Sequence, residues 1–255
     1  MEPLLEVSDV CLSYHSMSGE TPALSHVSFA LLPGEFLAIV GPSGCGKSTL
    51  LNLIAGLLAP EQGSITINGQ PVSSKNCKIG YMLQKDHLLE WRTIYKNILL
   101  GLEIRKERNP SRLNDIEEML QTYGLEKFRN AYPSQLSGGM RQRAALIRTL
   151  ALDPELLILD EPFSALDYQT RLAVSDDIGR ILRAQKRPAI LVTHDISEAI
   201  SMADRIIVLS ARPATVKKII PIEFSMKNRT PLECRNTPEF KDYFNLIWKE
   251  LNAHA

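Results

Sequence analysis

The chain has 255 residues, of which 44% are hydrophobic and 23% charged, so it can bury a sizeable core and has the composition of a globular protein. Lys and Arg number 29 together, as do Asp and Glu, which gives a net charge of zero and argues against a nucleic-acid partner. The four cysteines show no metal-ligand spacing and are expected to be reduced thiols: Cys11, Cys45, Cys77 and Cys234.

No targeting or membrane-spanning segment is predicted. The first ten residues lack a basic segment followed by an apolar stretch, so we expect no signal peptide. The most apolar run, residues 50–59, is about half of the ~20 residues needed to span a bilayer. We therefore expect that this chain does not cross a membrane by itself.

The chain is predicted to begin with short antiparallel strands. Within the first 35 residues, Val27, Phe29 and Leu31 alternate with smaller or more polar residues, which is typical of half-buried strands. Residues 36–40 (FLAIV) follow a Pro-Gly turn and form a continuous apolar run, which indicates a strand buried on both faces.

The rest of the chain predicts an α/β fold with a mainly parallel sheet. Residues 48–58 have helical spacing and stop near Gly56 and Pro60. Further apolar runs predict buried strands, mostly separated by helix-like segments, at 78–83, 156–160, 189–194 and 205–209. Residues 93–150 contain no such strand and are rich in helix formers, so we expect an inserted helical lobe there.

The tail is predicted to be an amphipathic helix over residues 238–251. Its apolar positions follow helical spacing: Phe240, Tyr243, Phe244, Ile247, Trp248 and Leu251. Because the polar face carries both acids and bases, packing on the domain's own body is favoured over a membrane surface or a partner.

Residues 41–49 (GPSGCGKST) predict a loop that binds a nucleoside triphosphate. The pattern G-x-x-x-x-G-K-[ST] lies between a buried strand and a helix, where the mechanism needs it. Glycines let backbone N–H groups converge on a phosphate, the helix N-terminus adds partial positive charge, Lys47 reaches the β- and γ-phosphates, and Ser48 can ligate Mg²⁺. The loop comprises Gly41, Pro42, Ser43, Gly44, Cys45, Gly46, Lys47, Ser48 and Thr49.

Two adjacent acids end the predicted strand at 156–160. Ligands gather at the carboxyl ends of parallel strands, so Asp160 is expected to hold Mg²⁺ through water and Glu161 to polarise an attacking water.

Five motifs then occur in order: GPSGCGKST, LSGGMRQR (136–143), LLILDEP, SALD (164–167) and VTHD (192–195). Their order and separation resemble the nucleotide-binding subunit of an ABC transporter, over nearly the whole chain to about residue 225. The resemblance implies a P-loop NTPase core with an N-terminal antiparallel β subdomain. It divides the chain into an ABC ATPase domain at 1–225, with its helical lobe at about 93–150, and a helical tail at 226–255.

The resemblance also implies roles for single residues. Two copies pair head to tail, and each ATP lies between one chain's loop 41–49 and the other chain's LSGG. Ser137, Gly138 and Gly139 are then expected to contact the partner's γ-phosphate, and Asp167 to couple the two sites. In the chain's own site, Tyr14 matches the aromatic residue that stacks on adenine, Gln84 the residue that contacts Mg²⁺ and water, and His194 the switch histidine. The other histidines form no ligand pattern: His15, His26, His87 and His254.

Two positions carry separate expectations. Met140 stands where the family commonly has Gln, which puts the fine tuning of dimer closure in doubt. Cys45 lies at a helix N-terminus, an environment that lowers a thiol pKa, so we expect an alkylating reagent to inactivate the enzyme and ATP to protect it.

Residues 84–105 bear on the kind of ABC protein. Leu88, Leu89 and Trp91 lie where the family receives a helix of the membrane subunit, with packing of Trp91 inside the lobe as the alternative. The stretch is similar to the nitrate/sulfonate/taurine importer branch, which includes relatives for thiamine-precursor pyrimidines. It implies transmembrane permease subunits, an extracytoplasmic solute-binding protein, and a peripheral location on the cytoplasmic face of the membrane. An ATPase of an export or lipoprotein-release complex and a soluble non-transport ABC ATPase stay open as alternatives, and the solute is not readable.

Overall fold

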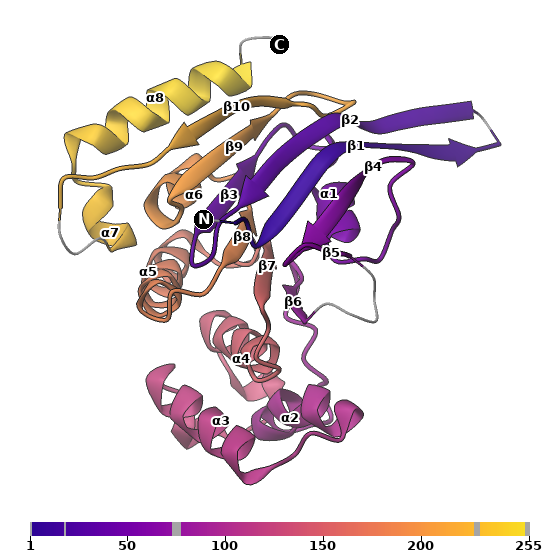
Figure 1. The fold of residues 1–255 in the computed structure, drawn as a ribbon. Helices are drawn as coiled ribbons and strands as arrows, with labels where there is room; N and C mark the ends of the chain where they lie inside the picture. Colours follow the sequence, from indigo (N-terminus) through magenta and orange to yellow (C-terminus); the bar gives the residue numbers. More distant parts are fainter. Residues whose placement is uncertain (1, 18, 73–77, 227–229, 253–255) are drawn as a thin grey trace.

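The computed structural model describes residues 2–17, 19–72, 78–226 and 230–252, which form two sheets with helices around them (Figure 1). The smaller sheet is antiparallel, in the order β2-β1-β4-β5. Its strands are β1 (Leu5–Ser16), β2 (Gly19–Leu31), β4 (Gln62–Ile67) and β5 (Gln70–Pro71). In β2, Val27, Phe29 and Leu31 are buried and alternate with more exposed residues, so the predicted half-buried strand is confirmed.

The larger sheet has the order β10-β9-β3-β8-β7-β6 and is parallel except for the edge strand β10. Its strands are β3 (Phe36–Val40), β6 (Ile79–Met82), β7 (Leu156–Asp160), β8 (Ala189–Val192), β9 (Arg205–Leu209) and β10 (Val216–Pro221). The predicted strands at 36–40, 156–160 and 205–209 match residue for residue. Strand β10 was not among the predicted elements.

The larger sheet separates two hydrophobic cores. Phe36, Ala38 and Val40 of β3 belong to the core shared with most of the helices, whereas Leu37 and Ile39 belong to the core beneath the smaller sheet and α1 (Lys47–Ile54). Burial on both faces explains the unbroken apolar runs in these strands.

The helical spacing in the sequence extends to residue 58, but helix α1 ends at Ile54. Gly56 has a φ of 68°, and a glycine in this left-handed conformation closes a helix. The other helices beside the sheet are α5 (Tyr168–Ala184) and α6 (Ile196–Met202).

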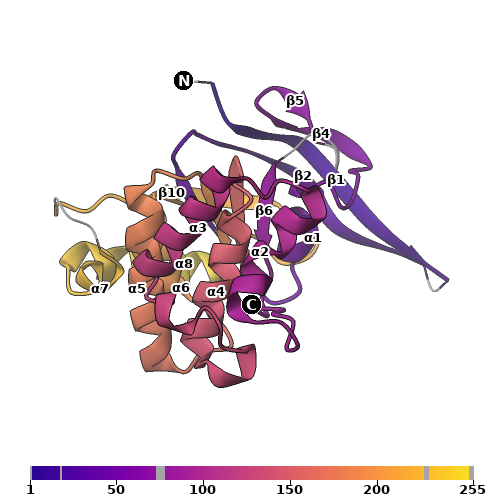
Figure 2. The ribbon, with the colours of Figure 1, turned by 90° about the horizontal axis from the view of Figure 1, so that it is seen from below.

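A helical lobe, residues 94–150, lies on the side of the sheet away from β10 and α8 (Figure 1; seen from below in Figure 2). It contains α2 (Ile94–Arg105), α3 (Pro110–Thr122), two short 3₁₀ turns (Glu126–Phe128 and Pro133–Gln135) and α4 (Gly138–Leu150). Thr93, Asn109 and Ser137 cap the three α-helices by accepting backbone N–H groups, which explains where these helices begin.

The tail forms α7 (Pro231–Cys234) and α8 (Pro238–Asn252), and α8 packs against α6 and β9 (Figure 1). Ile247 is fully buried there, as expected of a helix that packs on its own domain. Trp248 differs from the expectation, because it stays 56% exposed and stacks on Phe244. In the part of the chain that the structure describes, no helix is both long and apolar enough to span a membrane.

Candidate active site

The phosphate loop, residues 41–49, joins β3 to α1, and its glycines are required by the backbone. Gly44 has a φ of 73° and Gly46 a φ of 124°, a region that side-chain-bearing residues rarely adopt. A Cβ on Gly46 would also lie 3.0 Å from the carbonyl oxygen of Ala23. The loop therefore presents backbone rather than side chains at the start of α1, as a phosphate-binding turn requires.

Lys47, the first residue of α1, is buried and folds back over this loop. Its ammonium donates hydrogen bonds to the carbonyl oxygens of Gly41 at 2.8 Å and Pro42 at 2.9 Å. A third, longer contact joins the ammonium to Sγ of Cys45 at 4.0 Å. These contacts fix the charge at the loop, where an anionic ligand can replace the weak sulfur contact.

Asp160 and Glu161 lie at the carboxyl end of β7, as predicted. Burial and the neighbouring charge of Glu161 raise the pKa of Asp160, against the opposing effects of hydrogen bonds from Tyr81 and Ser48 and the charge of Lys47. A cation beside this carboxylate would favour its ionised form.

The donor set suits Mg²⁺ bound together with phosphates. Among the described residues, no group of three or more His, Cys, Asp or Glu side chains could hold a metal by itself. Mg²⁺ typically takes one or two protein oxygens and completes its shell with phosphates and water. The Ser48 hydroxyl lies close enough to the Asp160 carboxylate to lower its pKa, and the two side chains supply such oxygens.

Two other predicted site residues meet at Glu161. Its Oε2 lies 3.2 Å from Nδ1 of His194 and accepts a hydrogen bond from Nε2 of Gln84 at 3.3 Å. Gln84 also donates to the Ser164 hydroxyl at 3.2 Å. The backbone of Glu161 has a φ of 47°, a strained conformation that is often found at functional sites.

The phosphate loop, Glu161 and His194 border a cavity of about 680 Å³ that is polar enough and large enough for a nucleotide, whereas Asp160 and Gln84 are not among its lining residues. Its lining residues are Ser43, Gly44, Gly46, Lys47, Ser48, Thr49, Glu161, His194 and Arg212. Sequence reasoning missed Arg212. Its only signal was its position three residues after the carboxyl end of β9, the strand beside β3.

Tyr14 reaches the phosphate loop from the smaller sheet. Its hydroxyl lies 3.1 Å from the Thr49 hydroxyl, while the residue stays 42% exposed. An aromatic residue that is held at its tip and open to solvent has a face available for a planar base.

The signature loop, residues 136–139, lies elsewhere. None of the described residues that line the cavity comes from this loop. Ser137 caps α4 by accepting the Met140 N–H, so its own O–H remains able to donate. A Cβ on Gly139 would lie 2.9 Å from Val174 of α5, so the loop packs directly on that helix, which Asp167 caps.

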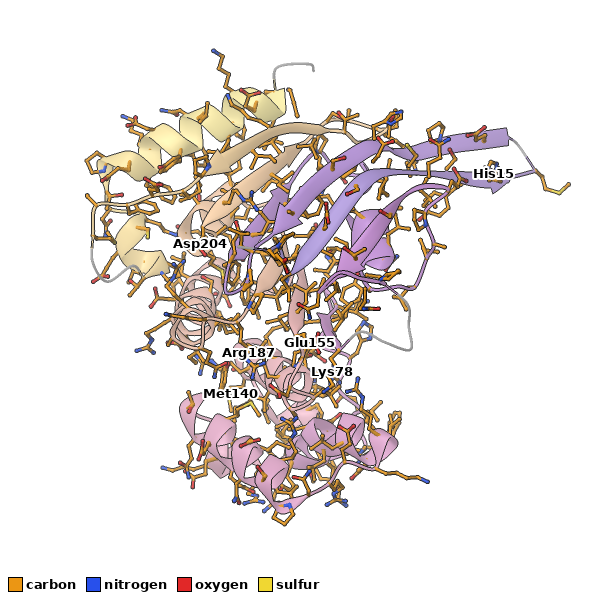
Figure 3. The ribbon with its side chains drawn as sticks, in the orientation of Figure 1. His15, Lys78, Met140, Glu155, Arg187 and Asp204 are labelled. Carbon is orange, nitrogen blue, oxygen red and sulfur yellow. The ribbon has the colours of Figure 1, made fainter. Side chains whose placement is uncertain are left out.

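The structure tests the pKa expected for Cys45, whereas the effect of Met140 on dimer closure stays a prediction. Burial raises the pKa of the Cys45 thiol despite the opposing charge of Lys47, so the expected lowering is wrong. Cys45 is only 1% exposed, and desolvation of a thiolate outweighs the favourable helix N-terminus. Met140 is half-buried on α4, between the sheet and the helices α2 and α3 (Figure 3), and packs against the main core. Cys77 and His254 lie outside the described residues.

Comparison with known proteins agrees with this geometry. Residues 24–164 match the family "ABC transporter". The chain is 45% identical to an uncharacterized ABC transporter ATP-binding protein, YtlC of Bacillus subtilis, over 98% of this chain and 96% of that one. It is 41% identical to the aliphatic sulfonates import ATP-binding protein SsuB of the same organism, over 86% and 82%. The solved dimeric structure of MJ0796, a bacterial ABC transporter cassette, matches with a TM-score of 0.74 and 31% identity, over 86% and 99%.

The fold and the phosphate loop thus define a P-loop ATPase with an N-terminal antiparallel sheet. The chain belongs to the ABC transporter family, as an ATP-binding subunit that hydrolyses ATP. The fold class and the ATPase activity expected from the motifs are confirmed.

Proposed function

We propose that this chain powers an importer of a small solute, of the nitrate, sulfonate, taurine or thiamine-precursor type. The observation that carries this proposal is the 41% identity with a sulfonate-import subunit over most of both chains. YtlC, which is similar over a longer stretch, is an uncharacterized ABC transporter subunit and neither supports nor opposes import.

In the proposed mechanism the chain's own residues hold and orient the reactants. Backbone N–H groups of residues 43–49 and the Lys47 ammonium bind the phosphates. Ser48, Asp160 and Gln84 would hold Mg²⁺, which supplies charge neutralisation on the phosphates when bound. Arg212 is placed at the cavity wall to add a further positive charge.

Glu161 accepts a hydrogen bond from the attacking water and orients it. His194 contacts Glu161 through Nδ1, which leaves Nε2 for the γ-phosphate. Gln84 follows β6, which flanks β7 on the side opposite to β8, and donates to the same carboxylate oxygen of Glu161. A change at the nucleotide therefore reaches residue 84 directly.

A second copy completes the site. The signature loop lies outside the chain's own cavity, and the solved MJ0796 cassette is dimeric, both of which support ATP enclosed between two chains. Ser137, Gly138 and Gly139 then face the partner's γ-phosphate, and Tyr14 stacks on adenine. ATP binding closes the dimer and hydrolysis reopens it.

The surface that follows Gln84 is the proposed contact with the permease. Trp91 is 76% exposed, so the alternative in which it packs inside the lobe does not apply. Leu88 is buried and anchors the same segment. A large exposed aromatic residue beside a buried anchor is typical of a binding surface.

A pull-down of tagged Glu161→Gln chain from its native membranes with ATP, analysed by mass spectrometry, tests the proposal. Import predicts a permease together with an extracytoplasmic solute-binding protein. Trp91→Ala should lose the permease, whereas Ile104→Ala, which removes an equally exposed (74%) apolar residue of the nearby helix α2, should keep it. Recovery of an export or lipoprotein-release complex, or of soluble partners alone, would contradict import and leave the ATPase assignment intact.

A further inference from the structure

Two arginines of α4 tie the segment that follows Gln84 to the helix that begins at the signature loop. Arg141 donates from Nε to Oδ2 of Asp86 at 2.8 Å and from Nη2 to Oδ1 of Asp86 at 3.1 Å. The same Nη2 reaches Oε1 of Glu90 at 2.8 Å. About two turns further along α4, Arg148 donates to the backbone carbonyls of Asp86 and His87 at 2.6 and 2.7 Å.

The Asp86–Arg141 pair is a strong contact. It is bidentate and mostly shielded from solvent, the combination in which a charged hydrogen bond contributes most. Burial by itself raises the pKa of Asp86, but the hydrogen bonds from Arg141 outweigh it and hold the pKa below its usual value.

Asp86 is itself held in place on the lobe. Its Oδ1 accepts the Leu88 N–H at 2.9 Å. The fully buried amide of Asn97 on α2 accepts the Leu89 N–H at 2.7 Å and donates to the Leu89 and Arg92 carbonyls. Asp86 is therefore a firmly held partner for the Arg141 side chain.

Arg141 transmits that position to the signature loop. Its backbone N–H donates to the carbonyl oxygen of Ser137 at 2.9 Å, and the neighbouring Met140 N–H donates to the Ser137 hydroxyl at 3.4 Å. A continuous set of contacts therefore runs from Asp86 through Arg141 to Ser137.

From these contacts we infer that Asp86 and Arg141 are positioning residues for hydrolysis in the other copy's site. This inference rests on the proposed dimer, in which Ser137 serves the partner's ATP. Although Asp86 lies two residues from Gln84 of its own site, its side chain acts through Arg141 on the signature loop. Loss of the pair misplaces Ser137 in the partner's site and leaves the chain's own nucleotide-binding loop unchanged.

Mixed dimers test on which side the pair acts. A limiting amount of one chain is assayed with a large excess of Glu161→Gln chain, which binds ATP but does not hydrolyse it. All measured hydrolysis then occurs at the limiting chain's phosphate loop, completed by the excess chain's signature loop. Asp86→Asn, which keeps the oxygen that caps Leu88, and Arg141→Ala are each placed in either chain.

We expect either substitution in the excess chain to lower kcat about tenfold or more with KM for ATP nearly unchanged, because a misplaced transition-state group affects turnover rather than ground-state binding. In the limiting chain the same substitution should change kcat less than about threefold. Arg143→Ala is the matched control, because it removes a 2.6 Å ion pair of the same helix with Asp177 of α5. In the excess chain it should leave kcat near the reference value.

An equal or larger loss from the limiting chain, or no loss from either, would overturn the inference. A rate per limiting chain that is the same with and without the excess chain, at a concentration too low for the limiting chain to pair with itself, would instead contradict the proposed dimer. Thermal unfolding of each variant shows that the chains compared are folded.

Discussion

Replacement of Glu161 by Gln should leave ATP bound and nearly abolish its hydrolysis. In the structure Oε2 of Glu161 faces two donors, Nδ1 of His194 at 3.2 Å, when it carries the proton, and Nε2 of Gln84 at 3.3 Å. A glutamine at this position keeps these contacts by turning its carbonyl oxygen towards them. Its NH₂ group then occupies the place of Oε1 and offers a donor where the water needs an acceptor.

The expected loss is that of a general base, about 10²–10⁴ in rate. At 1.36 kcal/mol for each tenfold change, this corresponds to about 3–5 kcal/mol of transition-state stabilisation. Phosphate release in steady state gives kcat, and equilibrium titration with a fluorescent ATP analogue gives the affinity, which should change less than about threefold. Glu155→Gln is the control. Glu155 lies just before the amino end of β7, away from Glu161, and accepts a hydrogen bond from the Asn68 amide (Figure 3 labels Glu155). A Glu161→Gln chain that keeps more than a tenth of the wild-type rate would refute the role.

Three further predictions concern binding, stability and reactivity. Lys47→Ala should weaken ATP binding about ten- to hundredfold in the same titration, because a charged hydrogen bond contributes roughly 1.5–3 kcal/mol; unchanged affinity would exclude Lys47 from the phosphate site. Burial raises the pKa of Glu198 from 4.5 to about 7, so between these pH values the folded chain keeps a proton that the unfolded chain loses. The stability of the fold therefore falls as the pH rises through this range. Glu198→Gln removes this dependence, and its free energy of unfolding relative to wild type, measured with urea, should rise by about 3 kcal/mol between pH 4 and pH 8; a pH-independent difference would contradict the burial argument. Cys45 should react with iodoacetamide more slowly than the less buried Cys11, as followed by peptide mass spectrometry, because its thiolate is disfavoured; faster labelling of Cys45 would restore the original expectation.

The sequence predicted best those features that depend on local pattern. The strand at 36–40 is apolar at every position because both of its faces are covered, and its bounds follow directly. The phosphate loop was predictable because its glycine spacing has one physical purpose. The residues around Glu161 converge from three different segments, and only the resemblance to a family linked them in advance.

Features that depend on tertiary packing were not predictable in the same way. The Cys45 pKa depends on burial that the neighbouring residues in the sequence do not reveal. Trp248 has the spacing of the buried face of α8, yet that face is wider than the surface that α6 and β9 cover, so its ring stays exposed. Arg212 belongs to no motif, and its place at the cavity follows only from the position of the loop after β9.

The account depends most on ATP being enclosed between two copies of the chain, and a mass measurement in solution tests this directly. Light scattering of the Glu161→Gln chain should give 28.5 kDa without nucleotide and twice that mass at saturating ATP. Ser137→Arg in the same background should keep the lower mass with ATP, because the large side chain blocks the partner's phosphate. A Glu161→Gln chain that binds ATP and stays at 28.5 kDa, or one that doubles equally well with Ser137→Arg, would contradict the account.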